Sequence, residues 1–171
     1  MTLPEGITVG AIVALNAVGD VYHPQTGQCI ASARMPDGTP VMADGLLYGT
    51  SPMPAQMRIP APGSNTTIGV VATNLELTKA QATKLAQMAQ DGLARAIVPA
   101  HTTYDGDTAF CLSTAARPLS GAEADDITAI GSLAAEVLAA AVVRAVEAAR
   151  QAGGCPAARD IEAGRRDSDR K

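Results

Sequence analysis

Three runs of β-branched and aliphatic residues stand out along the chain and predict strands. The first covers residues 7–18 and ends at Gly19-Asp20, a turn signal. The second covers residues 66–74, and the third, residues 108–115, follows a polar loop over residues 100–107. The first two runs are almost continuously apolar, which predicts strands that are buried on both faces.

Two stretches have apolar residues at helical spacing. The first covers residues 79–97, opens with Thr78 and Gln81 in the arrangement of a capping box, and stops at Pro99. The second is rich in alanine, opens with a similar pair, Ser120 and Glu123, and is expected to end at Gly153-Gly154. The order of strand, loop, strand, helix, strand and helix favours an α/β layered sandwich.

Between residues 23 and 63, prolines and turn glycines interrupt any regular spacing of hydrophobic residues. We therefore expect a long irregular segment there, not a second domain. After Arg159, basic and acidic residues alternate without an apolar face, which is typical of a solvated chain. The predicted organisation is one domain over residues 1–152 and a charged, disordered tail over residues 153–171.

Composition narrows the class of protein. With 171 residues, 47% of them hydrophobic, the chain can build one core, but a net charge of -4 and 2% aromatic residues disfavour nucleic acid as a partner. The apolar run near the amino terminus lacks a basic flank and is too short to span a bilayer. Three widely spaced cysteines predict neither disulfides nor a zinc site. We expect a soluble, cytoplasmic protein that does not bind membranes.

The most informative position is the junction Asn65-Thr66, where a Pro/Gly-rich arm enters a predicted strand. A Thr hydroxyl held by a rigid strand can attack the carbonyl of the preceding residue, and the α-amine that scission frees is a base with an ordinary pKa of about 7.7–8.0. Threonine pairs are common at strand starts that follow loops, so the pattern alone favours an ordinary strand start.

Other polar residues offer further candidates. Asp105 and Asp107 flank a glycine, so their carboxylates could orient an ammonium or hydroxyl group, although a simple turn has the same pattern. Asn16, near a predicted strand end, could donate its amide to an oxyanion or simply satisfy a turn. His101 could act as a base or be solvated. Cys111, inside a predicted strand, has the character of a small core residue.

Several segments together resemble the self-processing L-aminopeptidase/D-esterase family, which includes the nylon-oligomer endohydrolases. They are ITVGAIVALNAVGDV, NTTIGVVATNLELTKAQATKLAQMAQDGLARAIVPAHTTYDGDTAFCLSTA and IGSLAAEVLAAAVVRAVEAA. The resemblance covers residues 7 to about 149 apart from the proline-rich arm. Its most specific elements are the NTTIGVVAT and DGDT motifs, which lie 39 residues apart from Thr66 to Asp105 (105 minus 66).

The resemblance implies a four-layer αββα sandwich similar to the N-terminal-nucleophile hydrolases, with a connectivity shared with the ornithine acetyltransferases. It also implies that autoproteolysis between Asn65 and Thr66 frees Thr66 as the nucleophile. Asp105 and Asp107 would be the family's acidic pair, and Asn16 would help to hold the oxyanion. The resemblance implies a homo-oligomer. It implies no metal or organic cofactor.

The family's pattern places further strands and an active-site lysine ahead of the matched region. The sequence has no lysine before Lys79, so the amino-terminal part of the sandwich is expected to be missing from it. The strands over residues 7–18 and 66–74 would then expose more apolar surface than a monomer tolerates. This leads to the hypothesis of a truncated product, or of one half of a split enzyme whose amino-terminal half is encoded separately.

The expected activity is hydrolysis of amide bonds at the amino-terminal residues of small peptides, amides or esters, through an acyl-enzyme on Thr66. Transfer of the acyl group to an amine, in the manner of the ornithine acetyltransferases, is a close alternative. A non-catalytic remnant that serves as an interaction module is an alternative of another class.

Overall fold

A computed structural model of the chain describes residues 1–3, 6–35, 37–51, 61 and 64–161. Its centre is a three-stranded sheet in the order β1 (Val9–Ala14), β6 (Ile68–Leu75) and β8 (Thr108–Arg117). Strand β1 runs antiparallel to β6, whereas β6 and β8 are parallel. The end of β1 and the starts of β6 and β8 therefore meet at one end of the sheet.

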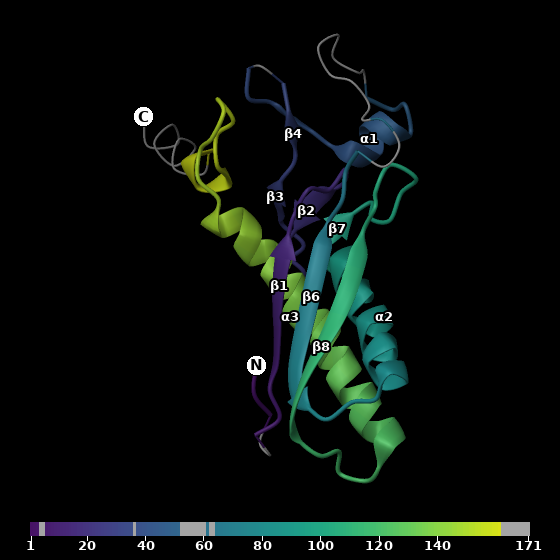
Figure 1. Cartoon of the computed structure of the whole chain (residues 1–171). Helices are drawn as coiled ribbons and strands as arrows, with labels where there is room; N and C mark the ends of the chain where they lie inside the picture. The colour runs from purple at the N-terminus through teal and green to yellow at the C-terminus, as the bar shows by residue number, and fades with distance from the viewer. Residues whose placement is uncertain (4–5, 36, 52–60, 62–63, 162–171) are drawn as a thin grey trace.

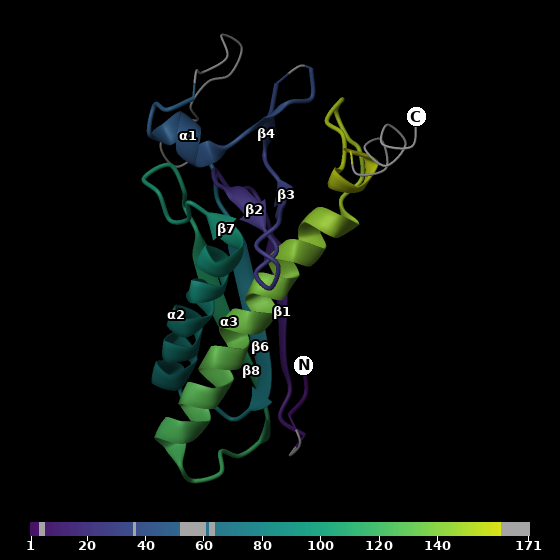
Figure 2. The ribbon, with the colours of Figure 1, turned by 180° about the vertical axis from the view of Figure 1, so that it is seen from behind.

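Two long helices, α2 (Lys79–Ala96) and α3 (Glu123–Ala148), form a layer behind this sheet (Figure 1, Figure 2). The side chain of Thr78 accepts from the backbone of Gln81 and the Gln81 side chain accepts from the backbone of Thr78, so the predicted capping box of α2 is confirmed. Helix α3 crosses β6 where Gly69 leaves room for Leu138: a Cβ at residue 69 would lie 2.9 Å from a Leu138 methyl group.

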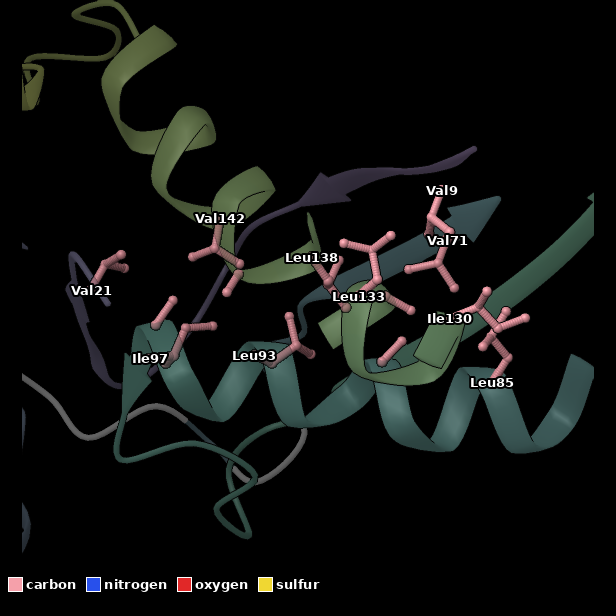
Figure 3. Close-up of a cluster of buried hydrophobic side chains, with 14 of the residues drawn as sticks. Val9, Val21, Val71, Leu85, Leu93, Ile97, Ile130, Leu133, Leu138 and Val142 are labelled. Carbon is pink, nitrogen blue, oxygen red and sulfur yellow. The ribbon is translucent and has the colours of Figure 1, made fainter. Parts of the chain in front are cut away.

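Helix α3 is the one helix in the described ranges that is long and apolar enough to cross a membrane. More than half of its most apolar window, 56%, is nevertheless buried inside the protein. This burial is typical of a core helix. The side chains that α2, α3 and the sheet place between them form the hydrophobic core (Figure 3); among its fully buried members are Val9, Val71, Leu85, Leu93, Ile130, Leu138 and Val142.

Short elements lie beyond the end of the sheet where β6 begins (Figure 1). A second sheet has the order β3 (Cys29–Ala31), β2 (Asp20–Tyr22), β7 (Ile97–Val98). A two-stranded ribbon joins β4 (Ala33–Arg34) to β5 (Pro40–Val41), and helix α1 (Ala43–Leu47) follows. The segment expected to be irregular over residues 23–63 therefore contains regular elements, although residues 36, 52–60 and 62–63 lie outside the described residues.

One face of the central sheet points away from α2 and α3 (Figure 1). Several apolar side chains of the three strands are exposed. Ile12 is 71% exposed, Phe110 53%, Leu112 51% and Ile68 45%. Ile12 pairs with Val70, and Val70 with Phe110, so these side chains form a continuous row across the sheet. The prediction that β1 and β6 are buried on both faces is wrong for the described chain, in which this face exposes apolar side chains.

Two further predictions differ from the structure. Helix α3 begins at Glu123 without a side-chain cap, because the Ser120 hydroxyl bonds to the Asp126 carboxylate at 2.8–2.9 Å instead of capping the helix. The helix ends at Ala148, before the expected Gly153-Gly154. Within the tail predicted over residues 153–171, Ala157 is buried and residues 158–161 are helical. Residues 162–171 lie outside the described residues.

Candidate active site

The peptide bond between Asn65 and Thr66 lies between two neighbouring segments of chain. On one side, the Thr66 N–H donates to the backbone oxygen of Asn16 at 2.9 Å. On the other, Asn65 forms a parallel bridge with Asp105, and the Gly106 N–H donates to the Asn65 oxygen at 2.7 Å. The bond therefore continues the hydrogen-bond ladder of β6 beyond its first residue, and both of its polar groups are held.

Asp105 fixes the loop that carries this ladder. One carboxylate oxygen accepts from the Val18 N–H at 3.2 Å, and the other accepts from the N–H of Thr102 at 3.0 Å and from its hydroxyl at 2.7 Å. The carboxylate thus ties the chain after β1 to the loop before β8. These three bonds occupy three of its roughly four acceptor sites.

Asp107 holds the residue that follows Thr66. Its Oδ1 accepts from the Thr67 N–H at 2.9 Å, and its Oδ2 lies 3.0 Å from Nδ1 of His101. The Asp107 side chain is only 2% exposed and that of His101 is 33% exposed. His101 adopts a left-handed backbone with φ 56°, which an L-residue rarely takes. The candidate base is thus brought to the acidic pair through Asp107.

The two carboxylates do not converge on one point, as the D-G-D pattern had suggested they could. Within the described residues they have separate hydrogen-bond partners: Asp107 accepts from the N–H of Thr67, next to Thr66, whereas Asp105 accepts from those of Val18 and Thr102. The Asn16 side chain also lies at the junction, where its Nδ2 is 3.5 Å from the Ser64 oxygen and its Oδ1 is 3.5 Å from the Asn65 amide. Both contacts are long for hydrogen bonds.

Sequence reasoning missed Gly106, which was treated only as the hinge between two aspartates. A Cβ at this position would lie 2.6 Å from the Thr66 hydroxyl oxygen, so the glycine borders the candidate nucleophile directly. The signal for it was the D-G-D motif itself, because a glycine between two fixed residues often marks a close approach of backbone.

The site contains no cluster suited to a metal: no group of three or more His, Cys, Asp or Glu side chains gathers within the ranges that the structure covers. Cys111 packs against the core, as expected from its place in a strand, and burial raises the pKa of its thiol. A raised pKa leaves less thiolate at neutral pH, which does not favour Cys111 as a nucleophile.

The structure thus places Thr66, two residues before β6, next to the segment Asp105-Gly106-Asp107. The model of Peptidase family S58 matches residues 1–159, and the chain belongs to this family. It is 41% identical to an uncharacterized aminopeptidase of Mycobacterium leprae over 91% of this chain, and 39% identical to an uncharacterized aminopeptidase of Mycobacterium tuberculosis over 94% of it.

A more distant similarity, 32% identity over 48% of this chain, joins it to a 6-aminohexanoate-oligomer endohydrolase of Kocuria. The matched region is only part of these proteins. It spans 45% of the Mycobacterium leprae relative, 49% of the Mycobacterium tuberculosis relative and 25% of the endohydrolase. The chain thus spans about half the length of the two aminopeptidases.

Proposed function

We propose that this chain carries the nucleophile of a self-processing amidohydrolase, and that scission of the Asn65-Thr66 bond activates it. The main support is the pair of hydrogen bonds that holds both polar groups of this one peptide bond, from Thr66 to Asn16 and from Gly106 to Asn65. Membership of a peptidase family supports the chemistry.

The proposed scission is an acyl shift followed by hydrolysis. The Thr66 hydroxyl oxygen bonds to the carbonyl carbon of Asn65, the bond from that carbon to the Thr66 nitrogen breaks, and the hydroxyl proton passes to the nitrogen. Water then hydrolyses the resulting ester and releases the Asn65 carboxylate. The product has a free α-amine on Thr66. The reaction consumes one water molecule and needs no oxidant or cofactor.

After scission, the same residue would supply base and nucleophile. The nitrogen that lies 2.9 Å from the Asn16 oxygen in the intact chain becomes the α-amine, so this oxygen is in place to orient it. An amine with an ordinary pKa near 7.7–8.0 is partly neutral at physiological pH and can accept the hydroxyl proton. Asp107 would keep Thr67, and hence the start of β6, in position through its bond to the Thr67 N–H.

The substrates we propose are small peptides, amides or esters that lose their amino-terminal residue through an acyl-enzyme on Thr66. The names of the relatives, aminopeptidase and oligomer endohydrolase, support this class of substrate. Water as the acceptor gives hydrolysis, and an amine would give the acyltransferase alternative. A cytoplasmic location and a homo-oligomer remain predictions from the sequence.

Intact-mass spectrometry of the purified chain tests the proposal. Wild type should yield fragments 1–65 and 66–171, whereas Thr66→Ala should stay whole and Thr66→Ser, which keeps a hydroxyl, should still split. Thr114→Ala removes an exposed hydroxyl from β8 and serves as the matched control, with wild-type cleavage expected. Scission of Thr66→Ala at the same bond, or no scission of wild type, would contradict the proposal.

The exposed apolar face of the central sheet supports a second role, which is association with another part of the enzyme. We propose that the family's amino-terminal portion packs on the row formed by Ile12, Val70 and Phe110 and completes the αββα sandwich. This portion could precede Met1 on the same polypeptide or belong to another one. Two observations favour it: the row is apolar and exposed, and the chain matches less than half the length of its mycobacterial relatives.

A binding experiment tests this association. The part of the Mycobacterium leprae relative outside the matched region is expressed separately and titrated into the chain by calorimetry. Wild type should bind it, Phe110→Asp should lose the binding, and Gln87→Asp, a charge placed on the exposed side of helix α2, is the control. A dimer of this chain that Phe110→Asp abolishes would instead make a second copy the occupant. Binding without cleavage by either chain would favour the interaction module.

A further inference from the structure

Gly106 combines two contacts with the atoms that react in self-cleavage. Its N–H donates to the Asn65 oxygen at 2.7 Å, and the position of its missing Cβ lies 2.6 Å from the Thr66 hydroxyl oxygen. The electrophilic carbonyl and the nucleophilic hydroxyl therefore both border one residue. The Asn16 side chain, by contrast, contacts the Ser64 oxygen and not that of Asn65.

We propose that Gly106 is a catalytic residue of self-cleavage, which donates its backbone N–H to the oxyanion that develops on Asn65. The proposal rests on the scission at Thr66 proposed above. When the Thr66 oxygen bonds to the carbonyl carbon, the π electrons of the carbonyl move onto the Asn65 oxygen. The Gly106 N–H, already at hydrogen-bond distance, stabilises that charge without reorganisation.

The surroundings of Gly106 hold this donor in place. The residue before it, Asp105, is fixed by bonds from Val18 and Thr102, and the residue after it, Asp107, is fixed by the bond from the Thr67 N–H. A donor fixed before the reaction costs less to align than one on a free loop. The two aspartates are thus positioning residues for the Gly106 N–H.

The same geometry explains why this residue is glycine. The bond from Gly106 to Asn65 requires close approach of the two backbones, and the Thr66 hydroxyl occupies the space where a side chain would begin. An alanine would keep the N–H but push either the hydroxyl or the loop away. Alanine at this position should therefore slow the reaction although every hydrogen-bonding group remains.

The test compares the rate of self-cleavage in Gly106→Ala and Gly10→Ala by intact mass. Residue 10 lies in β1, and a Cβ there would meet nothing within 4 Å, so Gly10→Ala is the matched control. We expect Gly10→Ala to cleave within about twofold of wild type and folded Gly106→Ala to cleave at least about tenfold more slowly, since loss of an oxyanion donor costs about 10²–10³ in rate.

A second measurement does not depend on how Gly106→Ala folds. In uncleaved Thr66→Ala, a scalar coupling through the hydrogen bond should join the ¹⁵N of Gly106 to the ¹³C carbonyl of Asn65. Absence of this coupling, or cleavage of Gly106→Ala at the rate of Gly10→Ala, would overturn the role of Gly106 alone. A wild type that stays whole, like Thr66→Ala, would overturn the self-cleavage proposal and this role together.

Discussion

The Asp107 carboxylate accepts from the backbone N–H of Thr67 at 2.9 Å and so joins the start of β8 to the start of β6. The carboxylate is 2% exposed, and its other oxygen lies 3.0 Å from His101. The Asp107 side chain thus adds one hydrogen bond to the backbone ladder between β6 and β8, at the end of the sheet where the candidate nucleophile lies.

Replacement of Asp107 by alanine should lower both stability and self-cleavage. The Thr67 N–H would lose its acceptor, at a cost of about 1–3 kcal/mol in the free energy of unfolding, which urea titration measures. Asp107→Asn keeps an acceptor oxygen and should lose less. Asp91→Ala, on the exposed side of α2, is the control and should change stability by no more than about 0.5 kcal/mol. Equal losses for Asp107→Ala and Asp91→Ala would show that the bond contributes nothing.

Asp105→Ala should loosen the loop before β8 without unfolding the sheet. The N–H groups of Val18 and Thr102 both donate to this carboxylate, so their hydrogen exchange should accelerate in the variant. The amide of Val71, a fully buried residue in the middle of β6, should exchange as in wild type. Unchanged exchange at Val18 and Thr102 would contradict the proposed link between the two segments.

Asp20 should make stability fall with rising pH. It is 3% exposed, and burial raises its pKa above 3.8, although a bond from the Ala43 N–H at 2.8 Å opposes the shift. The folded chain then binds more protons than the unfolded chain between pH 3.8 and the raised pKa, so the contribution of this residue is fully present below pH 3.8 and is lost as pH rises through the raised value.

Asp20→Asn keeps an acceptor for the Ala43 N–H and removes the charge. Its gain in unfolding free energy over wild type should be smallest at about pH 4 and largest at about pH 7, measured by urea titration. The exposed Asp91→Asn should show no such trend. A gain that shrinks as pH rises would mean that the pKa of Asp20 is lowered in the folded chain.

Two glycines at the contact between α2 and α3, one in each helix, should differ in how much stability their replacement by alanine costs. A Cβ at Gly92 would collide with the backbone oxygen of Ala135, whereas one at Gly131 would meet the side chain of Met88, which can move. Gly92→Ala should therefore cost about 1–3 kcal/mol, and Gly131→Ala clearly less. Thermal unfolding of the two variants measures the difference, and similar losses would contradict the tight approach at Gly92.

Local patterns were predictable from the sequence where nothing competed with them. The Thr78–Gln81 capping box formed as expected because both partners are close along the chain. The same pattern at Ser120 and Glu123 failed because Asp126, one turn further on, takes the Ser120 hydroxyl. Strand β6 was predictable too, since Ile68, Val70, Val71 and Thr73 give it a high content of β-branched residues.

Relationships that depend on strand pairing were not predictable. The approach of Gly106 to Thr66 exists only because β6 and β8 are parallel and in one register, which no short motif specifies. The prediction that β1 and β6 are buried on both faces is wrong at Ile12 and Ile68, because an apolar run does not show how many layers surround it. The pattern of an arm that enters a strand made Thr66 a candidate, and the resemblance made it the main hypothesis.

The Asn65-Thr66 bond is held by Asn16 on one side and by Gly106 on the other. Asn16 lies 49 residues before Asn65 (65 minus 16), and Gly106 lies 40 residues after Thr66 (106 minus 66). If scission needs both contacts, it can occur only after these three distant segments have found one another. The cut would then act as an internal proofreading step for folding: a chain with mispaired strands would keep its arm and its nucleophile would stay blocked, so the enzyme would become active only in molecules that had already folded correctly.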